Sequence, residues 1–539
     1  MSRILSIVNL LLWCTFLEVG FSQQNPLAID TLEVKEMAQE FLFLTKSTWD
    51  PIKKLRTVSD HAVSFARVAR PVGALISAAA DSTQKIESAE ELKAIKELHE
   101  FLQEQFVALS TIVHSESKEI GHFVVNEDYR EAVRRPFDVI EPLYKNITDP
   151  LKERYQYKDE FIAMCGNGST SPYNVLLKME QSLKNDCQLP SQEPIENYAA
   201  IVELFEKIEQ RHPAEKYKWI KRSILAKAAV ASMQEKLNTI LNTANSANKA
   251  WKALIKLESD LHYHPCWLRT MADGNEWKRE PLFHFVQIVR LDLMKASLIA
   301  FHCAYISSAD NEKDIDQKFN EIAFSMQKTA AHVADWVEKM LENSWPTISR
   351  INAKSAIGDL DIKEIKKEYQ TVANNISYAL GQTGELKYDY TVIVFPNWTN
   401  PEAMAIISEA NSYFDLIDVN QINVIVVRIE DNKTNNELAC KAAAWFTPQI
   451  KAKMKYIINI WRDNKKPLNE LAKALKQSLQ YYRNLVLIHN WKFFSFAATI
   501  TLGIDQASVL RRANAEQSFD HKIVPALFDA EIFHVHMLL

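Results

Sequence analysis

Residues 88–113, SAEELKAIKELHEFLQEQFVALSTIV, decide the fold class of this chain. Ser88 and Glu91 are spaced as a capping box, in which each side chain bonds a backbone N–H group at the start of a helix. Apolar residues then recur every three or four positions: Leu92, Ile95, Leu98, Leu102, Phe106, Leu109 and Val113. Such an apolar stripe has to be covered by partner helices, so the stretch predicts a helical bundle.

Helical patterns continue along most of the chain. Asp50 followed by Pro51 predicts a helix start, and long helices are predicted at 213–261, 282–305 and 311–345. Only 10 of the 539 residues are glycine. Because tight turns and phosphate-binding loops need glycine, this scarcity favours long helices and argues against nucleotide-binding loops.

The pattern changes after about residue 385. Residues 388–395 and 422–429 are rich in β-branched and aromatic residues, which predicts two strands. Asn400-Pro401 predicts a helix between them, reaching about Phe414. A strand, a helix and a strand in this order suggest a right-handed parallel crossover. Helices at 435–456 and 467–488 and a weaker strand at 494–503 complete this region.

The predicted fold class is therefore mainly α, with one or more multi-helix bundles followed by a small C-terminal α/β domain. We expect a signal peptide at 1–22, an N-terminal helical bundle at 23–190, a second helical segment at 191–384 and the α/β domain at 385–539. The second segment either stands alone or belongs to the same bundle as the first.

The first 22 residues have the pattern of a secretory signal. A basic start at Arg3 precedes a mostly apolar run, and Gly20-Phe21-Ser22 places small residues before a cleavage site at Gln23. Secretion makes the Asn-X-Ser/Thr triplets candidate glycosylation sites at the surface. They are Asn146, Asn167, Asn375, Asn397 and Asn432. The expected location is extracellular.

Five cysteines remain after removal of the signal, and an oxidising compartment favours pairing. Cys165 and Cys187 flank one predicted helix, so we expect them to pair with each other. Cys266 and Cys303 are the next candidate pair. Cys440 is then the odd cysteine, either buried and unpaired or joined to another chain.

The densest group of metal-binding residue types contains His262, His264, His284 and His302, together with Cys266 and Cys303, and the candidates in it are His262, His264 and His302. His-X-His-X-Cys on an extended segment is able to bind zinc or copper. Competing explanations are stronger, because Pro265 interrupts the segment, Cys266 is accounted for by a disulfide and His302 lies in an apolar helix. The three histidines are thus weak metal candidates, and no cofactor is predicted. His534 and His536 near the C-terminus, with His521 upstream, fit a solvated strand edge.

Motifs of catalysis are not found in the sequence, whether nucleophile elbow, zinc-protease helix, phosphate loop or dinucleotide fingerprint. We therefore nominate no catalytic residue. The formal net charge of −5 gives no electrostatic reason to expect nucleic-acid binding. Two segments of small and apolar residues, 71–80 and 223–232, leave open a membrane-active function, although central helices of a bundle have the same composition.

Residues 30–190 resemble secreted helical proteins of invertebrates, nematodes among them, that have no assigned function. The similarity rests on the 92–113 stripe, on 129–144 with its internal prolines, on Phe161-Ile-Ala-Met-Cys165 and on Cys187 after a helix that begins with proline. A more distant similarity is to the helical bundles of pore-forming toxins. Neither resemblance implies catalytic residues.

Three hypotheses follow. The first is a secreted glycoprotein that binds an unknown extracellular protein or a membrane surface. The second is a membrane-active protein similar to pore-forming toxins. The third is a hydrolase-like enzyme with its site at the carboxyl ends of the 388–395 and 422–429 strands. The sequence leaves the ligand and the oligomeric state open.

Overall fold

The computed structural model describes residues 51–63, 66, 69, 127–148 and 155–383, with gaps at 167, 213–216, 228–230, 263, 308–310 and 359–368. Beyond residue 383 it describes the strands given below and a few single positions from 452 to 477. The signal segment, the 88–113 stripe, the 71–80 segment and Cys440 lie outside the described residues. Helices dominate the described part and strands begin only at Tyr388, so the mainly α fold class is confirmed.

The chain forms two compact units, each built from separated segments. Unit 1 contains residues 1–115, 131–180 and 290–331, and unit 2 contains 116–130, 181–289 and 332–539. The boundaries predicted after residues 190 and 384 differ from this division. The difference arises because helices in 290–331, far along the chain, belong with those in 131–180.

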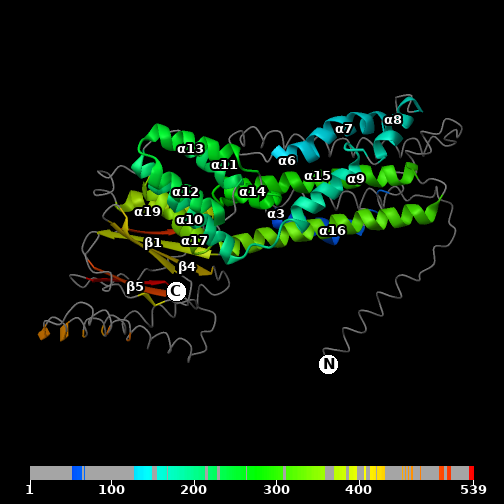
Figure 1. Ribbon diagram of the computed structural model, residues 1–539. Helices are drawn as coiled ribbons and strands as arrows, with labels where there is room; N and C mark the ends of the chain where they lie inside the picture. The colour runs from blue at the N-terminus through cyan, green and yellow to red at the C-terminus, as the bar shows by residue number, and fades with distance from the viewer. Residues whose placement is uncertain are drawn as a thin grey trace. The chain divides into compact units, whose positions relative to one another are not determined.

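Helices account for the described residues of unit 1. The helix α3 (Pro51–Asp60) begins at Pro51, as the sequence predicts. A π-helical turn, η1 (Arg130–Arg134), leads into α7 (Arg135–Thr148), which packs against α8 (Tyr155–Cys165) and α9 (Pro172–Glu180) (Figure 1). Residues 290–307 of α15 (Arg279–Ser307) and 312–331 of α16 (Glu312–Asn343) complete the unit.

Unit 2 contains the shorter helices and all the strands that the structure describes. Its helices are α6 (Glu127–Tyr129), η2 (Gln181–Asn185), α10 (Gln192–Arg211), α11 (Tyr217–Lys227), α12 (Ala231–Thr243), α13 (Ala247–Ser259), α14 (Trp267–Gly274), α17 (Thr347–Gly358), α19 (Tyr369–Thr383) and the remaining parts of α15 and α16.

The predicted 282–305 and 311–345 helices correspond to α15 and α16. The predicted long helix at 213–261 is wrong, because three helices occupy that region. The break before α13 has a local cause: Ser246 is extended and its hydroxyl accepts a bond from the Lys249 N–H, which starts a new helix.

Four strands form one sheet in the order β3-β4-β1-β6, comprising β1 (Tyr388–Pro396), β3 (Tyr413–Val419), β4 (Ile422–Glu430) and β6 (Ala507–Arg511). A second sheet has the order β2-β5-β7, with β2 (Ile406–Ile407), β5 (Ala497–Leu502) and β7 (Phe533–Leu538). The strands predicted at 388–395, 422–429 and 494–503 are confirmed as β1, β4 and β5.

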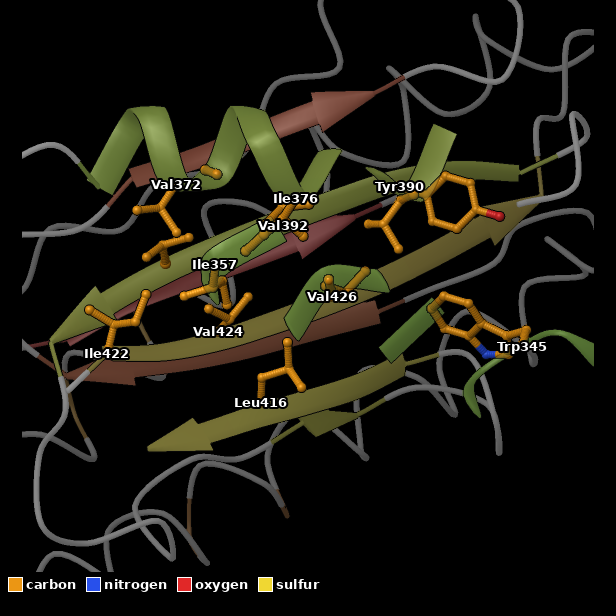
Figure 2. Close-up of a cluster of buried hydrophobic side chains, with 14 residues drawn as sticks. Trp345, Ile357, Val372, Ile376, Tyr390, Val392, Leu416, Ile422, Val424 and Val426 are labelled. Carbon is orange, nitrogen blue, oxygen red and sulfur yellow. The ribbon is translucent and has the colours of Figure 1, made fainter. Parts of the chain in front are cut away.

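The hydrophobic core of unit 2 lies between the larger sheet and the helices α17 and α19. Figure 2 shows Val392, Val424 and Val426 on the strands facing Ile357 and Ile376 on the helices. Every one of these side chains is fully buried. The alternate strand residues Ile393, Ile425 and Val427 are fully buried too, so both faces of β1 and β4 are covered.

This burial explains why the predicted parallel crossover is wrong. The strands β1 and β4 pair antiparallel, from Tyr388 opposite Glu430 to Pro396 opposite Ile422. A continuous apolar run is typical of parallel strands because both their faces are usually covered, and here an antiparallel pair has the same covering. The helix predicted from Asn400 to Phe414 is also wrong, since β2 and the start of β3 lie within that range.

Candidate functional site

The weak metal candidates occupy three different environments. His262 is exposed in the segment after α13, whereas His264 is half-buried and its Nδ1 accepts a bond from the Cys266 N–H at 3.0 Å. His302 lies on α15, fully buried, beside Tyr144. Among the residues that the structure describes, no group of three or more His, Cys, Asp or Glu is placed to hold a metal ion.

The glycosylation triplets fall mostly outside the described residues. Asn167, Asn397 and Asn432 lie outside the part of the chain that the structure describes. Asn146 lies in α7 and Asn375 in α19, and both are half-buried. Of the three histidines near the C-terminus, His534 and His536 lie on β7, which pairs with β5, and His521 lies outside the described residues.

All four candidate cysteines form disulfides, but not in the predicted pairs. Cys165 bonds to Cys303, 138 residues away, and Cys187 bonds to Cys266, 79 residues away. The predicted pairs, Cys165 with Cys187 and Cys266 with Cys303, are wrong. The prediction joined cysteines that are near in sequence, whereas α8 carries Cys165 next to Cys303 on α15, and the segment after η2 brings Cys187 to the start of α14.

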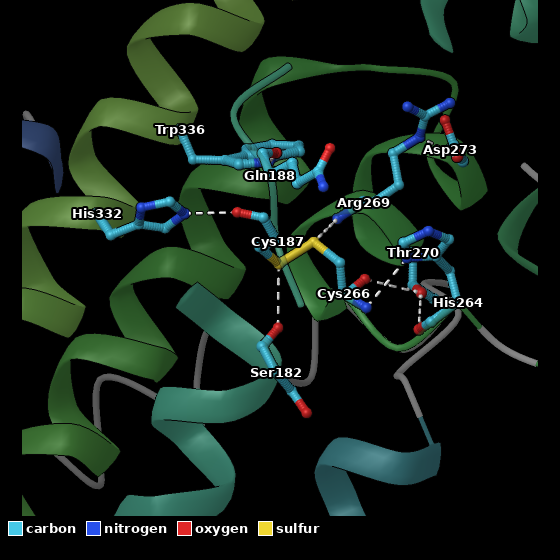
Figure 3. Close-up of a disulfide and its surroundings, with 10 residues drawn as sticks. All are labelled: Ser182, Cys187, Gln188, His264, Cys266, Arg269, Thr270, Asp273, His332 and Trp336. Atoms are coloured by element: carbon cyan, nitrogen blue, oxygen red, sulfur yellow. Dashed lines mark hydrogen bonds and ion pairs between the residues drawn. A yellow bond between two sulfur atoms is a disulfide. The ribbon is translucent and has the colours of Figure 1, made fainter. Parts of the chain in front are cut away.

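The Cys187–Cys266 disulfide holds a buried junction in unit 2, which Figure 3 shows. His332 Nε2–H donates to the carbonyl oxygen of Cys187 at 2.6 Å, and the Trp336 indole N–H donates to that of Gln188 at 3.0 Å. The sulfur of Cys266 accepts from the Arg269 N–H at the first turn of α14. The disulfide thus fixes an otherwise irregular segment against two helices.

A buried ion pair continues from this junction along α14. The Asp273 carboxylate accepts bonds from the Arg269 guanidinium and, at 2.8 Å, from the Trp277 indole N–H. Burial raises the pKa of Asp273, although Arg269 and both hydrogen bonds oppose that rise. Glu276 and Trp277 have positive φ angles of 57° and 58°. Residues other than glycine rarely adopt this conformation, and here it places the Trp277 ring 5.4 Å from the Arg269 guanidinium.

A row of polar pairs joins the end of η1 and the helix α7 to α15 within unit 1, and we call this row the polar seam. Arg134 Nε lies 3.1 Å from Asp292 Oδ2, and Lys295 forms an ion pair with Glu141. The Tyr144 hydroxyl lies 2.9 Å from His302 Nδ1. These contacts follow one another in the same direction along both helices, so α7 and α15 run parallel.

Burial dominates the electrostatics of the polar seam. Burial, followed by the positive charge of Arg134, lowers the pKa of Lys295 to about 8. Burial lowers the pKa of His302 to about 3 and raises the pKa of Tyr144. His302 is therefore neutral at physiological pH, and its Nε2 has no hydrogen-bond partner among the residues that the structure describes. Successive polar contacts between two parallel helices fix which turn of one helix faces which turn of the other.

The helices α11 and α13 carry a concentration of positive charge that is unusual for this chain. Their sequences, YKWIKRSILAK and ANKAWKALIKLES, contain seven basic residues and one acidic residue, Glu258. That acid is already paired, because Glu258 accepts bonds from Lys227 and Ser223. The whole chain has a net charge of −5, so this helix pair has the opposite sign to the protein as a whole.

Exposed apolar side chains accompany these charges. Trp219 on α11 is 62% exposed and Ile255 on α13 is 37% exposed. Isolated exposed apolar residues are common on protein surfaces, but Ile255 lies beside exposed lysines of α13, and Trp219 lies on the helix packed against it. We call Trp219, Ile255, Lys249, Lys252 and Lys256 the basic-aromatic surface.

Comparisons with protein-family models, with curated proteins and with solved structures found no match. The resemblance of residues 30–190 to secreted invertebrate helical proteins therefore stays a prediction. A search of the described residues for helices long and apolar enough to cross a membrane also found none. The candidate site accordingly rests on the residues and contacts of this chain.

The basic-aromatic surface was not predicted from the sequence, although a signal was present. Residues 218–227 and 249–256 are rich in lysine and contain two tryptophans. The sequence prediction placed both segments in one continuous helix. In that arrangement Trp219 lies far from Ile255, whereas the packing of α11 against α13 brings the two residues to neighbouring helices.

Proposed function

We propose that this protein is secreted and acts as a binding protein, with the basic-aromatic surface as its contact surface. The observation that carries the proposal is the exposed row Lys249, Lys252 and Lys256 on α13, next to the helix α11 that exposes Trp219. Tryptophan is enriched at the energetic centres of binding interfaces, since its large ring loses much water-exposed area on contact. A row of lysines adds attraction for a negatively charged partner.

The disulfides support an extracellular location. Both connect segments that are far apart in sequence, and structural disulfides persist mainly in oxidising compartments. The signal-like residues 1–22 and the triplets at Asn146, Asn167, Asn375, Asn397 and Asn432 belong to the same proposal.

Expression of the full chain in cultured insect cells tests secretion. We expect the protein in the medium, with Gln23 at its new N-terminus and with the bonds Cys165–Cys303 and Cys187–Cys266 in a non-reducing peptide map. Retention in the cytosol with residues 1–22 attached contradicts the proposal. Glycosidase treatment of the secreted protein reports which of the triplets carry glycans.

Binding of the purified, fluorescently labelled protein to intact cells tests the contact surface. We expect the wild type to bind and Trp219→Ser to bind several-fold more weakly. The matched control is Tyr378→Ser, which removes an aromatic ring that is 65% exposed on α19. Equal binding of both variants and the wild type contradicts the assignment of this surface.

The other two hypotheses receive less support. The hydrolase hypothesis depended on parallel strands, whose carboxyl ends share one edge, whereas β1 and β4 are antiparallel. The membrane-inserting hypothesis used residues 223–232, in which Ile224, Leu225 and Ala226 are buried in the protein.

A further inference from the structure

The solvent-facing side of α13 combines charge with an apolar residue. Ala250, Leu254 and Leu257 form its buried side. On the opposite side, Lys249, Lys252 and Lys256 recur at helical spacing and are exposed, with Ile255 between them. None of the three lysines forms an ion pair with another residue that the structure describes.

Contacts between α11 and α13 fix the level of Trp219 along the helix pair. Tyr217 reaches the Ala247 carbonyl oxygen, and its ring lies 6.1 Å from that of Trp251. Ser223 and Lys227 both bond Glu258, two to three turns further along the two helices. Trp219 precedes Ser223 by one turn, as Ile255 precedes Glu258. The two exposed apolar side chains therefore lie at the same level of the helix pair.

One exposed acid, Asp260, follows Lys256 by one turn, and the other acidic groups near α13 interact with residues other than its lysines. Glu258 is engaged by Lys227, and Glu209 acts on the Tyr217 hydroxyl. Glu276 is half-buried and stabilised by Lys278 and more weakly by Lys221 and Arg222. The positive field of Lys249, Lys252 and Lys256 thus points outward.

We propose that the basic-aromatic surface docks on the headgroup layer of an anionic phospholipid bilayer, which names the partner of the function proposed above and rests on it. Trp219 and Ile255 enter the interface while the three lysines contact lipid phosphates. Tryptophan is favoured at the headgroup level because its ring is amphipathic, and lysines near an anionic leaflet add attraction. A sulfated polysaccharide would use the lysines, but it offers little apolar surface to Ile255. The buried side of both helices stays in the protein core, so the association is peripheral.

Co-sedimentation with lipid vesicles tests the proposal. The purified, disulfide-bonded protein is mixed with vesicles of phosphatidylcholine containing about one quarter phosphatidylserine, and in parallel with pure phosphatidylcholine. We expect binding to the anionic vesicles only, weakened as salt is raised because exposed charges are screened. Equal binding to both vesicles, or to neither, overturns the proposal.

Two variants locate the interaction. Substitution of Lys249, Lys252 and Lys256 by glutamine should weaken vesicle binding on the order of 100-fold, and Trp219→Ser on the order of tenfold. The matched control replaces Lys178, Lys236 and Lys313, which are exposed on three other helices, by glutamine. It changes the net charge equally, so a similar loss in the control overturns the assignment to this surface.

The outcomes separate this inference from the proposed function. Binding to cells that depends on Trp219, without binding to anionic vesicles, leaves the binding function standing and refutes the lipid partner. Retention on immobilised heparin together with loss of cell binding after heparinase treatment would identify a sulfated polysaccharide instead. Secretion without any cell binding refutes the function itself, whatever the vesicles show.

Discussion

The polar seam of unit 1 and the sheet core of unit 2 both contain buried side chains, but of opposite kinds, and the seam reaches the surface at Arg134 and Glu141. Along α7 and α15, buried positions carry His302, Asp292 and Tyr144. Between α17, α19 and the four-stranded sheet, the buried cluster is made of aliphatic and aromatic residues such as Ile376, Val392 and Val426 (Figure 2).

The two kinds of side chain have different consequences: one mainly sets the free energy of unfolding, and the other sets which parts of the fold face each other. Aliphatic side chains gain free energy from burial wherever they fit, whereas a buried polar pair gains little on balance and is costly when one partner is lost. We therefore expect the sheet core to determine how stable unit 2 is, and the polar seam to determine which turns of α7 and α15 face each other.

The largest expected effect comes from removing the disulfides, one of which lies in each unit. Loops of 138 and 79 residues correspond to about 4 to 5 kcal/mol each in the chain-entropy model. Paired substitution of Cys165 and Cys303 by serine should destabilise unit 1 most, and substitution of Cys187 and Cys266 should destabilise unit 2 most. Hydrogen exchange of peptides from α7 and from α10 measures each unit separately. An identical loss in both units for both variants would contradict this.

A cavity in the sheet core should have the next largest effect. Ile376→Ala removes a fully buried side chain between α19 and the sheet, which costs about 3 to 4 kcal/mol. Urea unfolding monitored by exchange in β1 and β4 measures the loss. The control Tyr378→Ala, on the exposed side of the same helix, should change stability by no more than about 0.5 kcal/mol.

Substitutions of His302 and Tyr144 in the polar seam should have coupled effects on stability. His302→Leu removes the hydrogen bond between His302 and the buried Tyr144 hydroxyl, at a cost of about 2 kcal/mol. Adding Tyr144→Phe removes that hydroxyl as well, so the double variant should recover much of that loss. A double-mutant cycle, with each free energy of unfolding measured in denaturant, gives the interaction free energy between the two side chains. Additive losses would mean that the hydrogen bond contributes nothing.

Acid should also distinguish the two regions. Because burial depresses the pKa of His302 from 6.5 to about 3, the unfolded chain takes up a proton between these values and the folded protein does not. Stability contributed by neutral His302 is complete above about pH 6.5 and falls as pH is lowered, by about 2 kcal/mol at pH 5. Unfolding of unit 1 should show this slope, and the His302→Leu, Tyr144→Phe variant should lack it. The cluster under the sheet contains no carboxylate or histidine and should contribute no slope.

Local patterns predicted the individual elements well. Proline at position 51, the apolar spacing of 282–305 and the β-branched run at 388–395 all identify elements that are present. Each of these signals depends only on neighbours a few residues away. The helix break at Ser246 was missed because its capping signal is one side chain in an otherwise continuous helical pattern.

Long-range relationships could not be predicted in the same way. Strand direction was misjudged because Ile393 and Ile425 look the same in any sheet that is covered on both faces. The cysteine pairs were misjudged because nearness in sequence does not measure nearness in space. The basic-aromatic surface depends on the packing of α11 beside α13, which no single stretch of sequence contains.

The connectivity of the two disulfides bears on how the chain matures. Cys187 and Cys266 both lie between Cys165 and Cys303, so one covalent ring is nested inside the other. In the secretion proposed above, the chain enters an oxidising lumen from its N-terminus, so Cys187 would emerge soon after Cys165 and long before either correct partner. The first thiol must therefore wait unpaired, or a premature bond must be reshuffled by an isomerase. Oxidative maturation in the native order would end with the closing of the outer ring, once Cys303 has been translocated.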